Sequence, residues 1–156
     1  MSPIMSQVEI ARPCHEIFAY ATDPTRFAEW QDDVVSARMV EGGEKSEVGA
    51  RFTTVRRVGP GKRAMTQEIT ESAPPTHWAA HGVDGPVRPS VVLNVEPLED
   101  NSRSRVTFRM DFEAHGLGRL IVPLLVRPMA ARRAPRSYQH LKERLEGSAR
   151  PTGSGG

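Results

Sequence analysis

The chain has 156 residues, a length typical of one domain that buries a substantial core. Hydrophobic residues make up 38% of the sequence and charged residues 26%, a balance that excludes a disordered chain and an integral membrane protein. The formal net charge of +2 is too small to indicate nucleic-acid binding, although the isoelectric point is near 9.0.

Cysteine content and apolar runs narrow the possibilities further. Cys14 is the single cysteine, so an intramolecular disulfide and a cysteine-based zinc site are both excluded. Residues 1–13 lack a basic patch followed by an apolar run, and so they do not read as a signal peptide. The longest apolar run, residues 120–126, is far shorter than the roughly 20 residues of a membrane-spanning helix. We therefore expect a cytoplasmic location without stable membrane insertion.

The N-terminal part begins with one strand and two short helices. Residues 7–11 are predicted to form a strand with Val8 and Ile10 on one face. A proline then opens a short helix over residues 15–21, because proline in a first turn loses no needed hydrogen bond. A second short helix is predicted from residues 23–24, where aspartate is a good N-cap and proline suits the first helical position.

Six further strands follow, separated by turn signals rich in glycine and proline. Their predicted ranges are 34–41, 50–58, 62–71, 76–81, 89–96 and 103–114. In the last range apolar and polar residues alternate, so one face of that strand is apolar and the other faces water. A sheet with one solvent-exposed face needs another element to cover its apolar face.

The final segment, residues 117–146, is predicted to supply that cover. Its apolar residues recur at helical spacing, and most basic residues lie between them. Pro123, Pro128 and Pro135 interrupt the pattern, because a proline inside a helix removes a backbone hydrogen bond and clashes with the preceding turn. A kinked or interrupted helix is therefore predicted, with Pro123 tolerated if it lies near the first turn of the main helix.

This order of elements predicts an α+β fold. The expected architecture is a helix-grip: a curved antiparallel sheet of about seven strands around a long C-terminal helix, with two short helices after the first strand. We expect residues 1–147 to form a single domain and residues 148–156 to form a flexible tail. Seven segments share a further pattern: 8–10, 17–20, 23–30, 48–52, 74–75, 104–108 and 141–146. In these segments the sequence resembles the START-like (SRPBCC) superfamily, and within it the polyketide cyclase/dehydrase and lipid-transport group. The resemblance implies that residues 1–147 form a START-like ligand-binding domain.

The resemblance implies a cavity between sheet and helix that takes apolar or amphipathic molecules such as polyketides, lipids or quinones. It names no reaction, because the family has no shared catalytic motif to match. The residues expected to line the cavity are Phe52, Thr54, Met65, Ile69, Trp78, Leu93, Phe108, Met110, Phe112, Ile121, Leu124, Leu125 and Tyr138.

Arg56 is one candidate for a polar contact or a catalytic role in this cavity. Strand alternation places it on the same face as Phe52 and Thr54. If that face is inward, Arg56 could hold a ligand carboxylate or polarise a carbonyl during an aldol cyclisation. We favour the alternative interpretation, in which Arg56 lies at the strand end and extends to water.

Gln67 and Tyr138 are the other two candidates. Gln67 shares a face with Met65 and Ile69, although a register error of one residue would turn it to solvent. Tyr138 would place one hydroxyl in an apolar wall, whereas Trp78 is better explained as a core residue.

Other polar clusters are interpreted as solvated surface. Glu29, Asp32 and Asp33 could supply a general base only if burial perturbed their pKa, and the arginines of the final helix could bind a membrane or an acidic partner. The histidines belong to separate elements or lie too far apart on one strand to share a metal, and no metal-binding or nucleotide-binding motif is present. We therefore expect neither a metal nor a cofactor.

Three functions remain open. The leading one is binding of an apolar or aromatic small molecule, with or without cofactor-free cyclase or dehydratase activity. The others are a non-catalytic lipid or quinone carrier or sensor, and an interaction protein that uses its basic helix. A homodimer or a carrier-protein contact also stays open. An enzyme needs convergent polar groups in its cavity, a carrier can be apolar throughout, and an interaction protein would have a closed core.

Overall fold

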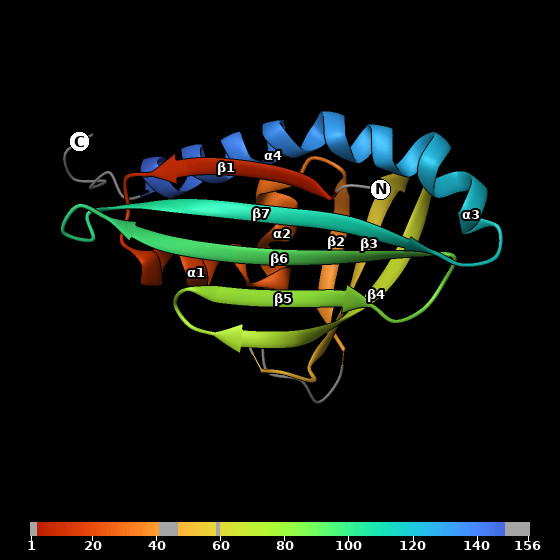
Figure 1. The fold of residues 1–156 in the computed structure, drawn as a ribbon, viewed down its shortest axis with the longest axis horizontal. Helices are drawn as coiled ribbons and strands as arrows, with labels where there is room; N and C mark the ends of the chain where they lie inside the picture. The colour runs from red at the N-terminus through yellow and green to blue at the C-terminus, as the bar shows by residue number, and fades with distance from the viewer. Residues whose placement is uncertain (1–2, 41–46, 59, 149–156) are drawn as a thin grey trace.

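The structure is a computed structural model that describes residues 3–40, 47–58 and 60–148. In these residues seven strands form one antiparallel sheet in the order β1-β7-β6-β5-β4-β3-β2 (Figure 1). The strands are β1 (Ile4–Ile10), β2 (Val34–Met39), β3 (Arg51–Val58), β4 (Gly61–Ala73), β5 (His77–Gly82), β6 (Val87–Leu98) and β7 (Arg103–Ala114). The helices are α1 (Cys14–Ala21), the 3-10 turn η1 (Pro24–Arg26), α2 (Phe27–Trp30), α3 (Gly118–Ile121), the π-helical turn η2 (Val122–Val126) and α4 (Arg127–Ser148).

The predicted α+β helix-grip fold is confirmed. Strand β7 has the predicted bounds, whereas β1 begins at Ile4 rather than at residue 7. Strands β2 to β7 run as a meander, and β1 pairs with β7 at the far edge. Strand β2 ends at Met39, before the predicted end at residue 41, which itself lies outside the described residues. The predicted tail, residues 148–156, overlaps the last residue of α4, and residues 149–156 lie outside the described residues.

The strand register places five buried side chains on one face of the sheet. Phe52 on β3 lies opposite Gln67 on β4, and Leu93 on β6 lies opposite both Trp78 on β5 and Phe108 on β7. Directly paired residues point to the same side of an antiparallel sheet. These five side chains are all buried, so they belong to the inner face.

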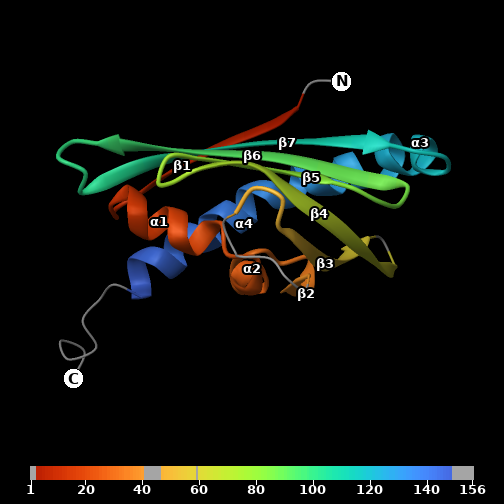
Figure 2. The same ribbon diagram turned by 90° about the horizontal axis from the view of Figure 1, so that it is seen from below.

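Helices α1, α2 and α4 cover that inner face. Figure 2 shows all three on the same side of β1, β5, β6 and β7. The core forms where Tyr138, Leu141 and Leu145 of α4 pack against the sheet and the short helices. The spacing of three and four residues between these side chains places them on one helix face, as the apolar periodicity predicted.

The C-terminal helix is interrupted, as its prolines predicted. Pro123 lies in the π-helical turn η2, where its missing N–H cannot complete the α-helical ladder. Pro128 falls in the first turn of α4, where that loss is harmless, and Pro135 lies inside α4 at an exposed position. The C-terminal helical segment that covers the sheet therefore consists of three consecutive parts, α3, η2 and α4, rather than one regular helix.

The C-terminal end of α4 is tied to the chain between β1 and α1. The carboxylate of Glu146 accepts hydrogen bonds of 2.8 Å from the Ala11 N–H and from the Lys142 ammonium group. The Arg12 guanidinium donates to the Leu145 carbonyl at 3.2 Å. Partial burial alone would raise the pKa of the Glu146 carboxyl, but the bonds from Lys142 and Ala11 outweigh it and hold the pKa below its ordinary value.

Replacing this carboxylate should destabilise the fold in a pH-dependent way. A depressed carboxyl pKa stabilises the folded state above the unfolded pKa of about 4.3, and that stabilisation is lost as pH falls through the folded value. Glu146→Gln should therefore lower the free energy of unfolding by about 0.5–1 kcal/mol at pH 7. The difference should shrink towards pH 3 in urea unfolding curves. Glu143→Gln, at an exposed position on α4, is the control; an equal loss there, or a gap that persists in acid, contradicts the assignment.

Candidate functional site

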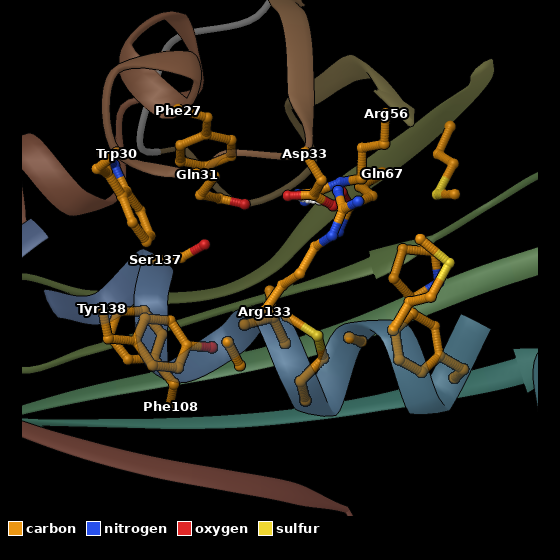
Figure 3. A pocket seen from close by; sticks show the side chains of 18 of the residues that line it. Phe27, Trp30, Gln31, Asp33, Arg56, Gln67, Phe108, Arg133, Ser137 and Tyr138 are labelled. Carbon is orange, nitrogen blue, oxygen red and sulfur yellow. Dashed lines mark hydrogen bonds and ion pairs between the residues drawn. The ribbon is translucent and has the colours of Figure 1, made fainter. Parts of the chain in front are cut away.

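A cavity of about 100 Å³ lies between the inner face of the sheet and α4 (Figure 3). Among the residues predicted for it, ten line the cavity: Phe52, Arg56, Met65, Gln67, Trp78, Leu93, Phe108, Met110, Phe112 and Tyr138. They come from strands β3 to β7 and from α4, so the whole width of the sheet except its two edge strands contributes. The structure thus brings together side chains that lie far apart in the sequence.

Aromatic rings form much of the cavity wall. The rings of Phe108 and Tyr138 stack with their centroids 3.8 Å apart and their planes within 5° of parallel. Trp30 lies 5.9 Å from Phe108 and 6.3 Å from Tyr138, tilted against both. The ring centroids of Phe52 and Trp78 are 6.1 Å apart, with an angle of 28° between the ring planes. Flat, polarisable walls of this kind suit a ligand that contains planar rings.

One ion pair lies in this mostly apolar wall. Arg56 of β3 donates from one guanidinium nitrogen to both carboxylate oxygens of Asp33, at 3.1 and 3.3 Å. Their side chains are only 16% and 23% exposed. The interpretation that Arg56 extends freely to water is therefore wrong, because Asp33 draws it against the cavity. Asp33, interpreted from the sequence as solvated surface, is likewise a cavity residue.

Three buried polar side chains face the cavity without a protein partner. Gln67, Ser137 and Tyr138 are 3%, 6% and 5% exposed, and within the described part of the chain none of their side-chain polar groups makes a hydrogen bond. Figure 3 shows the hydroxyls of Ser137 and Tyr138 directed into the cavity. Buried polar groups in native proteins are nearly always paired, so these three are available to a ligand or to water held in the cavity.

The Tyr138 hydroxyl is a hydrogen-bond donor rather than a base. Burial raises the pKa of this phenol well above its ordinary value of 10.0, because desolvation penalises the phenolate. The charges of Arg56 and Asp33 act on it in opposite directions, the arginine lowering the pKa and the aspartate raising it. The phenol therefore stays protonated at neutral pH.

The remaining predicted residues do not line the cavity. Thr54 and Ile69 share the inner face but are fully buried within the packed core, and the Thr54 hydroxyl has no hydrogen-bond partner among the described atoms. Ile121 packs beside a second apolar cluster that contains Val122 and Val126. Leu124 is 76% exposed, because the π-helical turn directs the two valines inward and leaves Leu124 outside. The side chain of Leu125 lies outside what the structure describes.

Sequence reasoning missed several residues of the site on α4. Ala130, Arg133, Ala134 and Ser137 line the cavity together with Tyr138. Their spacing of three and four residues is the signal that could have identified them, since it continues one helix face backwards from Tyr138. The prediction relied on large apolar residues of the helix, and these four side chains are small or charged.

The cavity is narrow for a ring-bearing ligand, because such sites usually measure roughly 300–1,000 Å³. Met65, Met110 and Met129 all line it. Methionine has several rotatable bonds and no branch, so it can repack around an incoming molecule at little cost. We therefore expect the cavity to widen when it is occupied.

Comparisons with known proteins agree with this geometry. A family model described as "Polyketide cyclase / dehydrase and lipid transport" matches residues 4–146. No curated protein matched the sequence. No helix among the described residues is both long enough and apolar enough to cross a bilayer.

Several solved structures share the fold at low sequence identity. The Zhui aromatase/cyclase from a Streptomyces species is 15% identical with a TM-score of 0.77, and the alignment covers 97% of each chain. A protein from Thermus thermophilus is 16% identical with a TM-score of 0.74, over 94% of this chain and 99% of the other. The di-domain ARO/CYC BexL is 16% identical with a TM-score of 0.71, over 97% of this chain and 48% of the other, so this chain spans about half of that protein.

Proposed function

The chain belongs to the polyketide cyclase/dehydrase and lipid-transport family, and from this premise we propose that its cavity binds a ring-bearing, polyketide-like small molecule between the sheet and α4. The bound molecule would have an apolar body and at least one carbonyl or hydroxyl group. In the catalytic form of this proposal, the domain promotes cyclisation or dehydration of the molecule without a cofactor.

One observation carries the proposal: buried, unpartnered polar groups converge on an aromatic cavity. The side chains of Gln67, Ser137 and Tyr138 are buried, yet their polar groups reach the cavity and have no hydrogen-bond partner among the described residues. A carrier for purely apolar molecules would gain nothing from such groups, and an interaction protein would fill the space with side chains. A ligand with polar edges would form hydrogen bonds with them.

The wall residues suit distinct parts of such a ligand. The parallel rings of Phe108 and Tyr138 would support its planar portion, and the protonated Tyr138 hydroxyl would donate to a ligand carbonyl. The Arg56 guanidinium, fixed by Asp33, would polarise a second carbonyl and stabilise the enolate that forms during an aldol cyclisation. Exclusion of water and restriction of a flexible chain would supply the rest of the acceleration.

The test is fluorescence titration with two naphthalene probes. Prodan carries a ketone, whereas phenylnaphthylamine has the same fused rings and no carbonyl. Tyr138→Phe keeps the ring stacked on Phe108 and removes only the hydroxyl. It should weaken prodan binding about fivefold, the value of one hydrogen bond, and leave phenylnaphthylamine binding unchanged. A loss of affinity for both probes or for neither contradicts the role of the hydroxyl, and failure of the wild-type protein to bind either probe contradicts the proposed function.

A further inference from the structure

Positive charge exceeds negative charge around the cavity. The charged residues that line it are Asp33, Arg56, Arg57 and Arg133, which are three cations and one anion. Asp33 is already paired with Arg56 at 3.1 Å. The neighbouring carboxylate of Asp32 is paired with His140 at 2.9 Å, and the Arg57 side chain donates to the Asp32 carbonyl oxygen. No further acidic side chain of the described residues reaches the cavity wall.

Two of the three cations, Arg57 and Arg133, have no carboxylate partner among the described residues, but Arg57 is exposed and donates to a carbonyl oxygen, whereas Arg133 has no protein partner there. In the described part of the chain it has no carboxylate within ion-pair distance and makes no side-chain hydrogen bond. Figure 3 shows its side chain extending from α4 across the cavity towards Arg56 and Asp33. Three cations and one anion leave a net positive charge in a wall that is mostly apolar, which is unfavourable unless a further anion binds there.

The same residue also faces outward. Met129 and Arg133 line both the cavity and an adjoining hollow, whose other residues are Arg132 and Arg136. The hollow therefore shares part of its wall with the cavity and carries three arginines. A guanidinium presents paired donors that match the oxygens of a carboxylate or a similar oxyanion.

From these contacts we propose that Arg133 binds an anionic oxygen group of the ligand at the part of the cavity beside this hollow, so that the ligand is a ring-bearing acid rather than a neutral molecule. This inference rests on the function proposed above and deepens it. The apolar part of the molecule lies against Phe108 and Tyr138, and its acid group pairs with Arg133. Arg132 and Arg136 add a favourable potential from the adjoining hollow, whereas Arg56 is largely neutralised by Asp33.

A matched pair of fluorescent probes separates this subsite from the cavity itself. Anilinonaphthalenesulfonate carries a sulfonate that is always ionised, and phenylnaphthylamine has the same rings without it. Arg133→Met keeps much of the length and apolar character of the side chain and removes its charge. We expect it to weaken binding of the sulfonate probe about tenfold or more and to leave the neutral probe within about twofold. Arg144→Met, at an exposed position on the same helix, should change neither affinity.

Salt dependence gives a second readout. Binding of the sulfonate probe to the wild-type protein should weaken as sodium chloride rises, and this dependence should flatten in Arg133→Met. If the neutral probe binds but Arg133→Met leaves sulfonate affinity unchanged, or lowers both affinities equally, the anion subsite is wrong and the cavity proposal stands. If neither probe binds the wild-type protein, the cavity proposal fails and the subsite fails with it.

Discussion

Replacing Ala130 with phenylalanine is expected to abolish ligand binding while leaving the fold intact. Ala130 lines the cavity from α4, and the cavity measures only about 100 Å³, so an added phenyl ring occupies the space that a ligand needs. Affinity for phenylnaphthylamine should fall about a hundredfold or below detection, since the ring contacts that provide the binding energy are lost. The measurement is fluorescence titration, with circular dichroism to check the fold.

The adjacent residue provides a matched control. Ala131 is exposed on α4, so Ala131→Phe adds the same side chain to the outer surface of the same helix. It should bind the probe as the wild-type protein does. Ala134→Leu adds a smaller group to the cavity from the next turn and covers the case in which Ala130→Phe does not fold. Unchanged affinity in a folded Ala130→Phe would place the binding site elsewhere.

The second large effect is on stability. Phe52 is fully buried, packs edge-on against Phe27 at 5.6 Å and lies 6.1 Å from Trp78, with an angle of 28° between the ring planes. Phe52→Ala should lower the free energy of unfolding by about 3–5 kcal/mol, because it removes buried apolar contacts and leaves a larger void. The melting temperature should fall by about 10–15 °C.

Leu120→Ala is the control for this truncation. Leu120 is 65% exposed, so removal of its side chain should change the free energy of unfolding by less than about 0.5 kcal/mol. Urea unfolding of both variants, without added ligand, gives the comparison. Similar losses in the two variants would contradict the central place of Phe52 in the core.

Strand periodicity predicted the inner face of the sheet well. The alternation of Phe52 with Arg56, and of Met65 with Gln67, placed all four on the face that lines the cavity. Alternation predicts the face of the sheet on which a residue lies, but not whether the residue lies in the cavity wall or in the packed core. For that reason Thr54 was expected in the cavity wall, whereas it packs within the core.

The polar part of the site depends on contacts that local patterns do not contain. Asp33 and Arg56 are 23 positions apart, and they meet because Asp33 directly precedes β2, whose first residue, Val34, pairs with Arg56 on β3. Arg133 lies on a helix with many arginines, and only the tertiary packing distinguishes it from those that face solvent. The prolines predicted the interruption of the helix, but the π-helical turn that exposes Leu124 could not be located from spacing alone.

Native mass spectrometry of the protein purified gently from its own host tests the central claim most directly. We expect one ring-bearing small molecule per chain, bearing an ionisable acid group, which can be extracted and identified. The same molecule should be missing from Ala130→Phe and present in Ala131→Phe. A protein that carries no such molecule, and whose melting temperature does not change with a broad panel of aromatic and lipid-like ligands, would contradict the account of the cavity as a binding site.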